Sequence, residues 1–320
     1  MSEALINYEP LYKSIIVLSS ISIISLILCM FAFLCYKSLH LYSYKQVMYL
    51  FIATTLSTYS YLLYFNKTNE LSTTVCQIQA FFLLWFEQSQ FIWSALISYT
   101  TYKITTQSLG SDFVPPANVQ KGYLYLGFIF PFANTAFAYL NGLLGESGHW
   151  CWISTLTIPG QILSWVAYSF YWAAIIFNTY YTVKLLMYVK GLNIDLKEKE
   201  IISKSLRKLY CYPVIQLIVT VPACLNKFLN FFVDSNSKSY NRVTWVFVIR
   251  TIIIVLSCSQ GFLLSLAFII NMRAIGGWCT PKKADLLIDE LSKVKTTGGI
   301  REEENKEEDE IGDDYNSNYN

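Results

Sequence analysis

The chain has 320 residues, of which 54% are hydrophobic, 17% aromatic and only 14% charged. Soluble proteins of ordinary composition carry about 25% charged residues, so this composition excludes a soluble globular protein and predicts one embedded in lipid. The net charge of +2 is unevenly distributed, because the last twenty residues contain nine acidic side chains. The part of the chain that precedes this acidic end is therefore basic.

Long stretches with few or no charged side chains predict the membrane spans, since about 20 apolar residues cross the hydrocarbon core. In chain order, we expect transmembrane helices at about residues 14–36, 46–66, 75–102, 122–140, 158–183, 209–232 and 243–270. The predicted fold class is therefore all-α, a seven-transmembrane-helix bundle over residues 14–272. An N-terminal arm of residues 1–13 precedes it, and a tail of residues 273–320 follows it.

Lysine and arginine are unequally distributed between the two sides of this predicted bundle. The loops after the first, third and fifth helices and the start of the tail contain fourteen of them, and the opposite side contains four. Cytoplasmic loops are enriched in these residues, so we expect an extracellular N-terminus, a cytoplasmic C-terminus and a multi-pass protein of the plasma membrane. In the tail we expect a short amphipathic helix from Thr280-Pro281 and a disordered acidic end beyond Gly298.

Two cysteines differ from the other six of the chain, which lie within spans or on the cytoplasmic side. Cys76 begins the third predicted helix, and Cys151 lies in the extracellular loop before the fifth. Both face an oxidising compartment, so we expect a disulfide between them; the alternative is two unpaired thiols near the membrane interface. On the same side, the sequon Asn66-Lys67-Thr68 makes Asn66 a glycosylation candidate.

Three ionisable side chains fall inside the predicted spans, where such groups are costly and normally face the bundle interior. Glu87 lies near the middle of the third helix, and Lys227 and Arg250 lie in the outer halves of the sixth and seventh. One interpretation is hydrogen bonding between helices, with Glu87 paired to one of the two cations. In the other, all three residues line a ligand-binding site, where two cations for one carboxylate suit an anionic ligand.

Polar side chains follow helical spacing on two of the predicted spans. Glu87, Gln90 and Ser94 share one face of the third helix. Gln161 and Tyr168 share one face of the fifth. The two stripes predict a central ligand-binding cavity that is open to the outside.

The loop after the fifth predicted helix ends in a basic segment. Asp195 and, three residues later, Glu198 predict the start of a helix that runs into the sixth span. The basic side chains of this segment are Lys199, Lys204, Arg207 and Lys208. These residues either set the membrane topology and contact lipid headgroups alone, or they dock a protein. The sixth span contains Pro213 and Pro222, which are candidate hinges.

Several classes of membrane protein are excluded because required residues are absent. A light-driven rhodopsin needs a lysine in the seventh helix for its retinal, and residues 243–270 contain none. A transporter built from repeats has two similar halves, and the first three and last three helices share no motif. His40 and His149 are expected on opposite sides of the membrane, so we expect no metal site, cofactor or enzyme activity. A signalling receptor remains; the alternative is a proton- or cation-coupled transporter or channel that uses Glu87.

Four regions of the chain carry motifs of a known receptor family. They are Cys76-Gln77-Ile78-Gln79 with Trp93, Trp150-Cys151-Trp152, Leu209-Tyr210-Cys211-Tyr212-Pro213 with Asn226-Lys227, and Gln260-Gly261-Phe262 with Asn271. Together they resemble the cyclic-AMP receptors and cyclic-AMP-receptor-like proteins of slime moulds and related protists. These are G-protein-coupled receptors distantly similar to the secretin class, and the resemblance spans all seven predicted helices.

This resemblance implies a disulfide between Cys76 and Cys151, an extracellular small-molecule ligand among the outer helix ends and a heterotrimeric G protein in the cytoplasm. We expect the four basic residues of the third cytoplasmic loop to face the G protein. The expected ligand-binding residues are Glu87, Gln90, Ser94, Gln161, Tyr168, Lys227 and Arg250. The lipid bilayer surrounds the bundle, and we expect no nucleic-acid partner.

Overall fold

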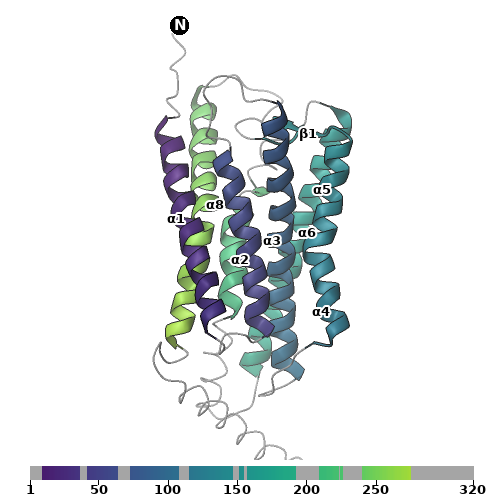
Figure 1. Cartoon of the computed structure of the whole chain (residues 1–320), viewed down its shortest axis with the longest axis vertical. Helices are drawn as coiled ribbons and strands as arrows, with labels where there is room; N and C mark the ends of the chain where they lie inside the picture. Colours follow the sequence, from purple (N-terminus) through teal and green to yellow (C-terminus); the bar gives the residue numbers. More distant parts are fainter. Residues whose placement is uncertain are drawn as a thin grey trace, which may run out of the picture.

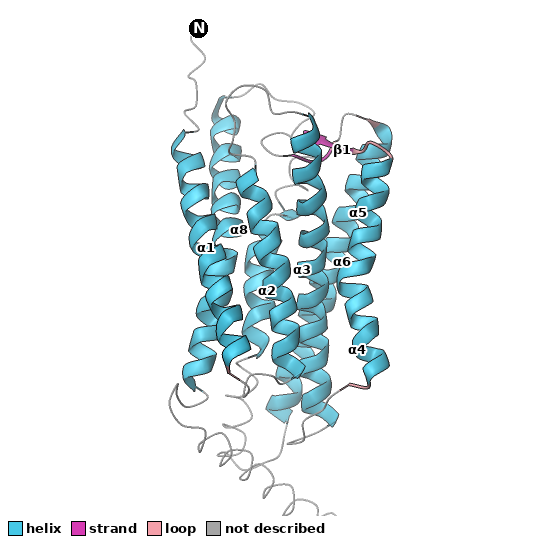
Figure 2. Ribbon diagram, viewed as in Figure 1, coloured by secondary structure: helices cyan, strands magenta, loops and turns pink. Residues whose placement is uncertain are grey.

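The computed structural model describes residues 9–36, 42–63, 73–107, 115–146, 151–154, 157–191, 209–222, 224–225 and 240–274. This part of the chain is mostly helical, and Figure 1 shows long helices that run side by side. The helices are α1 Glu9–Cys35, α2 Tyr42–Leu63, α3 Thr73–Gln107, α4 Ala117–Leu124, η2 Tyr125–Ile129, α5 Phe130–Leu140, α6 Ile158–Gly191, the helix Leu209–Pro222 and α8 Tyr240–Ala274. Two short strands, β1 Leu144–Glu146 and β2 Cys151–Ile153, pair antiparallel at one end of the bundle (Figure 2).

Within the described part of the chain, four helical segments are long and apolar enough to cross a membrane. They are Lys13–Cys35 in α1, Ala117–Leu140, Ile158–Gly191 and Thr251–Asn271 in α8. By contrast, α2 and α3 bury polar side chains such as Gln46, Thr54 and Gln88 among other helices. A polar side chain that faces the interior lowers the hydropathy of its helix without meeting lipid. This explains why these two helices are less apolar than their neighbours.

Several helices extend beyond the ranges predicted from the sequence. α1 begins at Glu9, inside the predicted arm, and α3 continues to Gln107. The charge-free criterion locates only the part of a helix that suits the hydrocarbon core, whereas a helix continues with polar residues through the headgroup region. The helix predicted at 122–140 is Ala117–Leu140. The predicted span at 209–232 beyond residue 225, the arm before Glu9 and the tail after Ala274 lie outside the described residues.

A π-helical turn, η2, interrupts the segment Ala117–Leu140 where it meets α3. Trp93 lies directly against Gly127, because a Cβ atom on this glycine would be 2.5 Å from the Trp93 ring. Trp85 donates its indole N–H to the carbonyl oxygen of Phe128, with an Nε1–O distance of 3.0 Å. A glycine and a backbone carbonyl in the π turn therefore allow two tryptophans of α3 to pack closely against it.

One serine of α1 enters the backbone hydrogen bonding of α8. The Ser22 hydroxyl accepts a hydrogen bond from the Phe262 N–H at 3.2 Å and donates one to the Cys258 carbonyl oxygen at 2.5 Å. In an uninterrupted α-helix these two backbone groups, four residues apart, would bond to each other. Gly261 permits the approach, since a Cβ atom there would be 2.7 Å from Leu26. Ser22 therefore joins the two helices through two backbone groups of α8.

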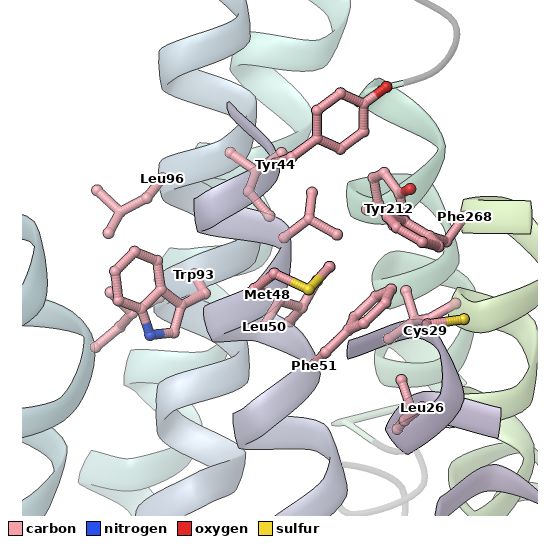
Figure 3. Packing of buried hydrophobic residues seen from close by; sticks show 14 residues of the cluster. Leu26, Cys29, Tyr44, Met48, Leu50, Phe51, Trp93, Leu96, Tyr212 and Phe268 are labelled. Carbon is pink, nitrogen blue, oxygen red and sulfur yellow. The ribbon is translucent and has the colours of Figure 1, made fainter. Parts of the chain in front are cut away.

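Among the described residues, two large clusters of buried hydrophobic side chains and a small third one of Ile15, Ile254 and Cys258 fill the bundle. The first, which we call the aromatic cluster (Figure 3), consists of Leu26, Cys29, Tyr44, Val47, Met48, Leu50, Phe51, Ile92, Trp93, Leu96, Ile97, Tyr212, Leu264 and Phe268. The second, which we call the cystine cluster, consists of Cys76, Ala80, Leu83, Leu84, Ala138, Leu144, Cys151, Trp152, Ile153, Ala167, Tyr171, Ile175 and Cys224. α3 contributes to both large clusters, so it is the central helix of the packing.

A disulfide joins Cys76 and Cys151, whose Cα atoms are 5.3 Å apart. It attaches strand β2 to the first turn of α3. In the hairpin, Cys151 lies opposite Glu146 and Trp152 opposite Gly145. The disulfide predicted from the sequence is therefore confirmed, and it holds the hairpin against the end of the bundle.

Candidate functional site

A cavity of about 120 Å³ lies inside the bundle at its cystine end. Its lining residues are Ser57, Thr58, Tyr61, Leu83, Glu87, Gln90, Phe91, Trp152, Tyr168, Tyr171, Gln216, Val219, Thr220, Cys224, Ile253, Ile254, Ser257 and Gln260. They come from α2, α3, β2, α6, the helix Leu209–Pro222, residue 224 and α8. A water molecule requires only about 10–15 Å³ of such space, so the cavity has room for several waters or a small polar ligand.

Glu87 brings a carboxylate into the cavity wall. Its Oε1 accepts a hydrogen bond from the Tyr61 hydroxyl at 2.9 Å, which joins α3 to α2. A hydrogen bond from a phenol stabilises the charged form of a carboxylate. Among the described lining residues, Glu87 is the only acidic one, and none is Lys, Arg or His. Within the described part of the chain, no group of three or more His, Cys, Asp or Glu that could hold a metal ion occurs.

Aromatic side chains form one side of the cavity. The ring centroids of Trp152 and Tyr168 are 5.1 Å apart, and those of Tyr168 and Tyr171 are 5.8 Å apart. Phe91 continues this contact, with its centroid 4.4 Å from that of Tyr171. The Tyr171 hydroxyl is buried and makes no hydrogen bond to any described residue. Buried polar groups normally have a partner, so this hydroxyl is available to a water or ligand in the cavity.

Side-chain amides connect four helices around the cavity. The Gln260 Nε2 of α8 donates to the Gln90 Oε1 of α3 at 3.0 Å and to the Gln216 Oε1 of the helix Leu209–Pro222. Gln90 in turn donates to the carbonyl oxygen of Ala53 in α2 at 3.5 Å. Gln216 donates to the Thr220 hydroxyl at 3.3 Å. These bonds depend on one another, so a ligand that displaces one amide would disturb the positions of several helices.

A second polar group lies one turn further along α3. The Asn178 Nδ2 of α6 donates to the Ser94 Oγ at 2.9 Å and to the carbonyl oxygen of Pro213 at 3.4 Å. The Ser98 hydroxyl donates to the Asn178 Oδ1. Proline lacks an N–H and so leaves a helical turn without one backbone hydrogen bond. Asn178 therefore connects α3 and α6 to the proline-containing turn of the helix Leu209–Pro222.

The structure brings three of the predicted ligand-binding residues together in the cavity wall: Glu87, Gln90 and Tyr168. Ser94 shares their face of α3, but it lies outside the wall and binds Asn178. Gln161 does not line the cavity. It is exposed in the first turn of α6, so helical spacing from Tyr168 did not predict its surroundings.

The side chains of the remaining predicted site residues lie outside the part of the chain that the structure describes. Arg250 belongs to α8, but its side chain is outside the described set. Lys227, the glycosylation candidate Asn66 and the four basic residues Lys199, Lys204, Arg207 and Lys208 lie outside the described residues. The alternative in which Glu87 pairs with one of the two membrane cations therefore stays a prediction.

Reasoning from the sequence missed seven polar residues of the cavity wall, of which Ser57, Thr58 and Tyr61 belong to α2. Gln216 and Thr220 are four residues apart, and Ser257 and Gln260 are three apart, so each pair has the spacing of one helix face. The same test that identified the stripes of α3 and α6 would have identified both pairs. Gln260 was noted only as part of a sequence motif.

The sequence was also compared with known proteins. The family model of the seven-transmembrane receptors of the secretin family matches residues 8–264. This range begins before α1 and includes every residue that lines the cavity. No curated protein matches the chain. The match is to receptors, so it does not favour a transporter or channel.

Proposed function

The chain belongs to the secretin family of seven-transmembrane receptors, and from this premise we propose that it is a G-protein-coupled receptor for an extracellular small molecule. The observation that carries the proposal is the polar cavity at the cystine end, surrounded by helices that hydrogen-bonded amides connect. In this proposal residues 14–272 cross the plasma membrane seven times. The N-terminus is extracellular, and the tail is cytoplasmic.

The cystine supports this orientation. Disulfides persist in oxidising compartments, and Cys76–Cys151 lies at the end of the bundle where β1 and β2 pair. In Figure 1 the N-terminal end of α1 points to the same end as β1. The excess of lysine and arginine in the loops of the opposite side agrees with a cytoplasmic location there. The cavity then lies in the extracellular half of the bundle.

The cavity wall suits a small polar ligand with an aromatic or apolar part. Glu87 would accept hydrogen bonds from the ligand, and the Tyr171 hydroxyl would donate one. The rings of Phe91 and Tyr168 offer flat apolar surface. Lys227 and Arg250, expected nearer the outer surface, are proposed to bind an anionic group of the same ligand. The resemblance to cyclic-AMP receptors makes cyclic AMP the first compound to test.

Activation is proposed to move the helix that contains Pro213. A ligand shifts a conformational equilibrium only through different affinities for the two states. Gln216, in the cavity wall, and Pro213, bound by Asn178, lie on the same helix less than one turn apart. A ligand that changes the amide contacts would therefore act directly on the proline-containing turn. The basic residues Lys199, Lys204, Arg207 and Lys208 are proposed to face the G protein.

A cell assay of G-protein activation with cyclic AMP, other nucleotides and small anions tests the proposal. For an active compound, Glu87→Gln should lower potency about 10- to 100-fold, because a hydrogen bond to a charged group contributes about 1.5–3 kcal/mol. The control is Gln88→Ala, since Gln88 accepts a hydrogen bond from Asn134 at 3.0 Å and does not line the cavity. At matched surface expression its potency should equal that of the wild type. Equal potencies for wild type and both variants would contradict the proposed site.

A separate double variant tests whether Lys227 and Arg250 bind the ligand. Lys227→Ala combined with Arg250→Ala should lower the potency of anionic agonists and leave that of uncharged analogues unchanged. The reason is that the variant removes positive charge and leaves the described cavity wall intact. An unchanged potency for anionic agonists would show that these residues do not bind the ligand.

A further inference from the structure

Tyrosine and lysine side chains gather between α3 and α6 at the end of α3 that is remote from the cystine. The members of this tyrosine–lysine cluster are Tyr99, Tyr102, Lys103, Tyr180, Tyr181 and Lys184. The Tyr181 centroid is 5.2 Å from that of Tyr99 and 5.5 Å from that of Tyr102. At a rise of 1.5 Å per residue, the cluster lies about 35–40 Å along α3 from Cys76. It therefore lies at the opposite membrane surface from the disulfide.

Both lysines of the cluster are held against tyrosine rings. The Lys184 Nζ donates to the Tyr180 hydroxyl at 3.3 Å and lies 5.0 Å from the Tyr102 centroid. The Lys103 Nζ lies 5.9 Å from the Tyr99 centroid. The two helix ends that contribute these residues, 95–107 and 176–191, contain no Asp or Glu. The cluster is thus a positively charged site to which its own helix ends bring no acidic group.

An apolar stripe continues from the cluster along α6. Ile176, Val183 and Met187 are 66%, 47% and 68% exposed. With Tyr180 and Lys184 they follow the spacing of one helix face. A free anion would contact the lysines alone, whereas a lipid would place its headgroup at the lysines and its acyl chains along Ile176, on the side of the stripe nearer the membrane centre.

We propose that the tyrosine–lysine cluster binds the headgroup of an anionic phospholipid in the cytoplasmic leaflet. Lys103 and Lys184 neutralise the phosphate groups, and the hydroxyl of Tyr180 lies beside the same site. The chains of the lipid lie against Ile176, which is about two turns nearer the membrane centre than Lys184. The proposal depends on the proposed orientation of the receptor, but it needs neither an agonist nor a G protein, so the two proposals fail independently.

Native mass spectrometry of the full-length receptor, titrated with phosphatidylinositol 4-phosphate, measures this binding directly. Lys103→Gln combined with Lys184→Gln should weaken it about 25-fold, since each lysine near an anionic lipid contributes about a factor of five. The double variant with arginine at both positions keeps the charge and should bind as the wild type does. The matched control is Lys121→Gln, because Lys121 is exposed near the end of α4 and lies outside the cluster. The soluble headgroup without acyl chains should bind more than tenfold more weakly than the lipid.

Several results would overturn the proposal. One is a glutamine double variant with wild-type thermal stability and lipid affinity within twofold of the wild type. Another is an equal loss of affinity for Lys121→Gln, which would indicate unspecific attraction to basic residues. Equal binding of the soluble headgroup would remove the role of the apolar stripe. Unchanged lipid binding together with lost nucleotide exchange on an added G protein would identify the cluster as a protein-docking surface.

Discussion

The aromatic cluster and the cystine cluster belong to one bundle, but of the two only the cystine cluster contributes described residues to the wall of the cavity. In the aromatic cluster, Phe51 and Phe268 are 0% and 1% exposed, and their rings meet edge to face at a centroid distance of 5.6 Å. The cavity beside the cystine cluster is instead lined in part by small polar residues such as Ser57 and Ser257. The bundle therefore has one half specialised for close packing and another whose residues leave room for a ligand.

The largest loss of stability is expected when a large side chain is removed from the aromatic cluster. Phe51→Ala would leave a void in the aromatic cluster and should lower the free energy of unfolding by about 3–5 kcal/mol. Phe91→Ala should cost less than half as much, because Phe91 already borders the cavity. Denaturation of the purified receptor in mixed micelles measures both values. Equal losses for the two variants would mean that the two halves are packed alike.

The disulfide should account for the next largest effect. Cys76→Ser removes a link across 75 residues and should lower the free energy of unfolding by about 2–5 kcal/mol. The agonist response should fall as well, because Trp152 of the attached hairpin lines the cavity. Cys35→Ser is the control, since Cys35 is free and exposed. Thermal unfolding and surface expression of the two variants should differ; identical behaviour would argue against a structural role for the disulfide.

A smaller loss of stability is expected where Trp93 packs closely against the π turn. Gly127→Leu would force carbon atoms into the Trp93 ring and should cost about 1–3 kcal/mol through overpacking. Gly122→Ala, in α4, should instead be neutral or stabilising, because no atom lies within 4 Å of its added Cβ and alanine favours a helix. The thermal midpoints of the two variants measure the contrast. A stable Gly127→Leu receptor would contradict the close approach of Trp93.

The smallest loss of stability is expected where Ser22 of α1 bonds to the backbone of α8. Ser22→Ala removes the hydroxyl that bonds Phe262 and Cys258 and should cost about 1 kcal/mol, because the two backbone groups can partly bond each other instead. Ser25→Ala should be nearly neutral, since Ser25 bonds only to a carbonyl of its own helix at 2.9 Å among the described residues. Unfolding in mixed micelles again provides the measurement. A cost for Ser25→Ala as large as that for Ser22→Ala would remove the special role of Ser22.

Part of the fold and the site followed from the sequence for physical reasons. Lipid requires apolar segments of a certain length, so charge-free stretches overlap the helices that the structure describes. Cysteines in an oxidising compartment predicted the disulfide. An acidic residue is costly inside a span, and this singled out Glu87, which lines the cavity together with Gln90 and Tyr168.

Other features depend on how one helix is rotated against another, which spacing within a helix does not determine. Gln260 meets both Gln90 and Gln216 only because three helices converge at one level. Gln161 has the spacing of the α6 stripe, but its side chain is exposed in the first turn of that helix. The π turn and the hydrogen bonds of Ser22 to the backbone of α8 have no local pattern that distinguishes them from an ordinary helix.

We propose that the receptor binds its agonist in the cavity. Ser257→Leu would fill part of the cavity, and Ser259→Leu adds the same atoms two residues further along α8, at a position that does not line it. In a G-protein activation assay at matched surface expression, Ser257→Leu should lower agonist potency by about tenfold or more, since a clash works directly against the bound state, and Ser259→Leu should leave it unchanged. Equal potencies for both variants and the wild type would contradict agonist binding in the cavity.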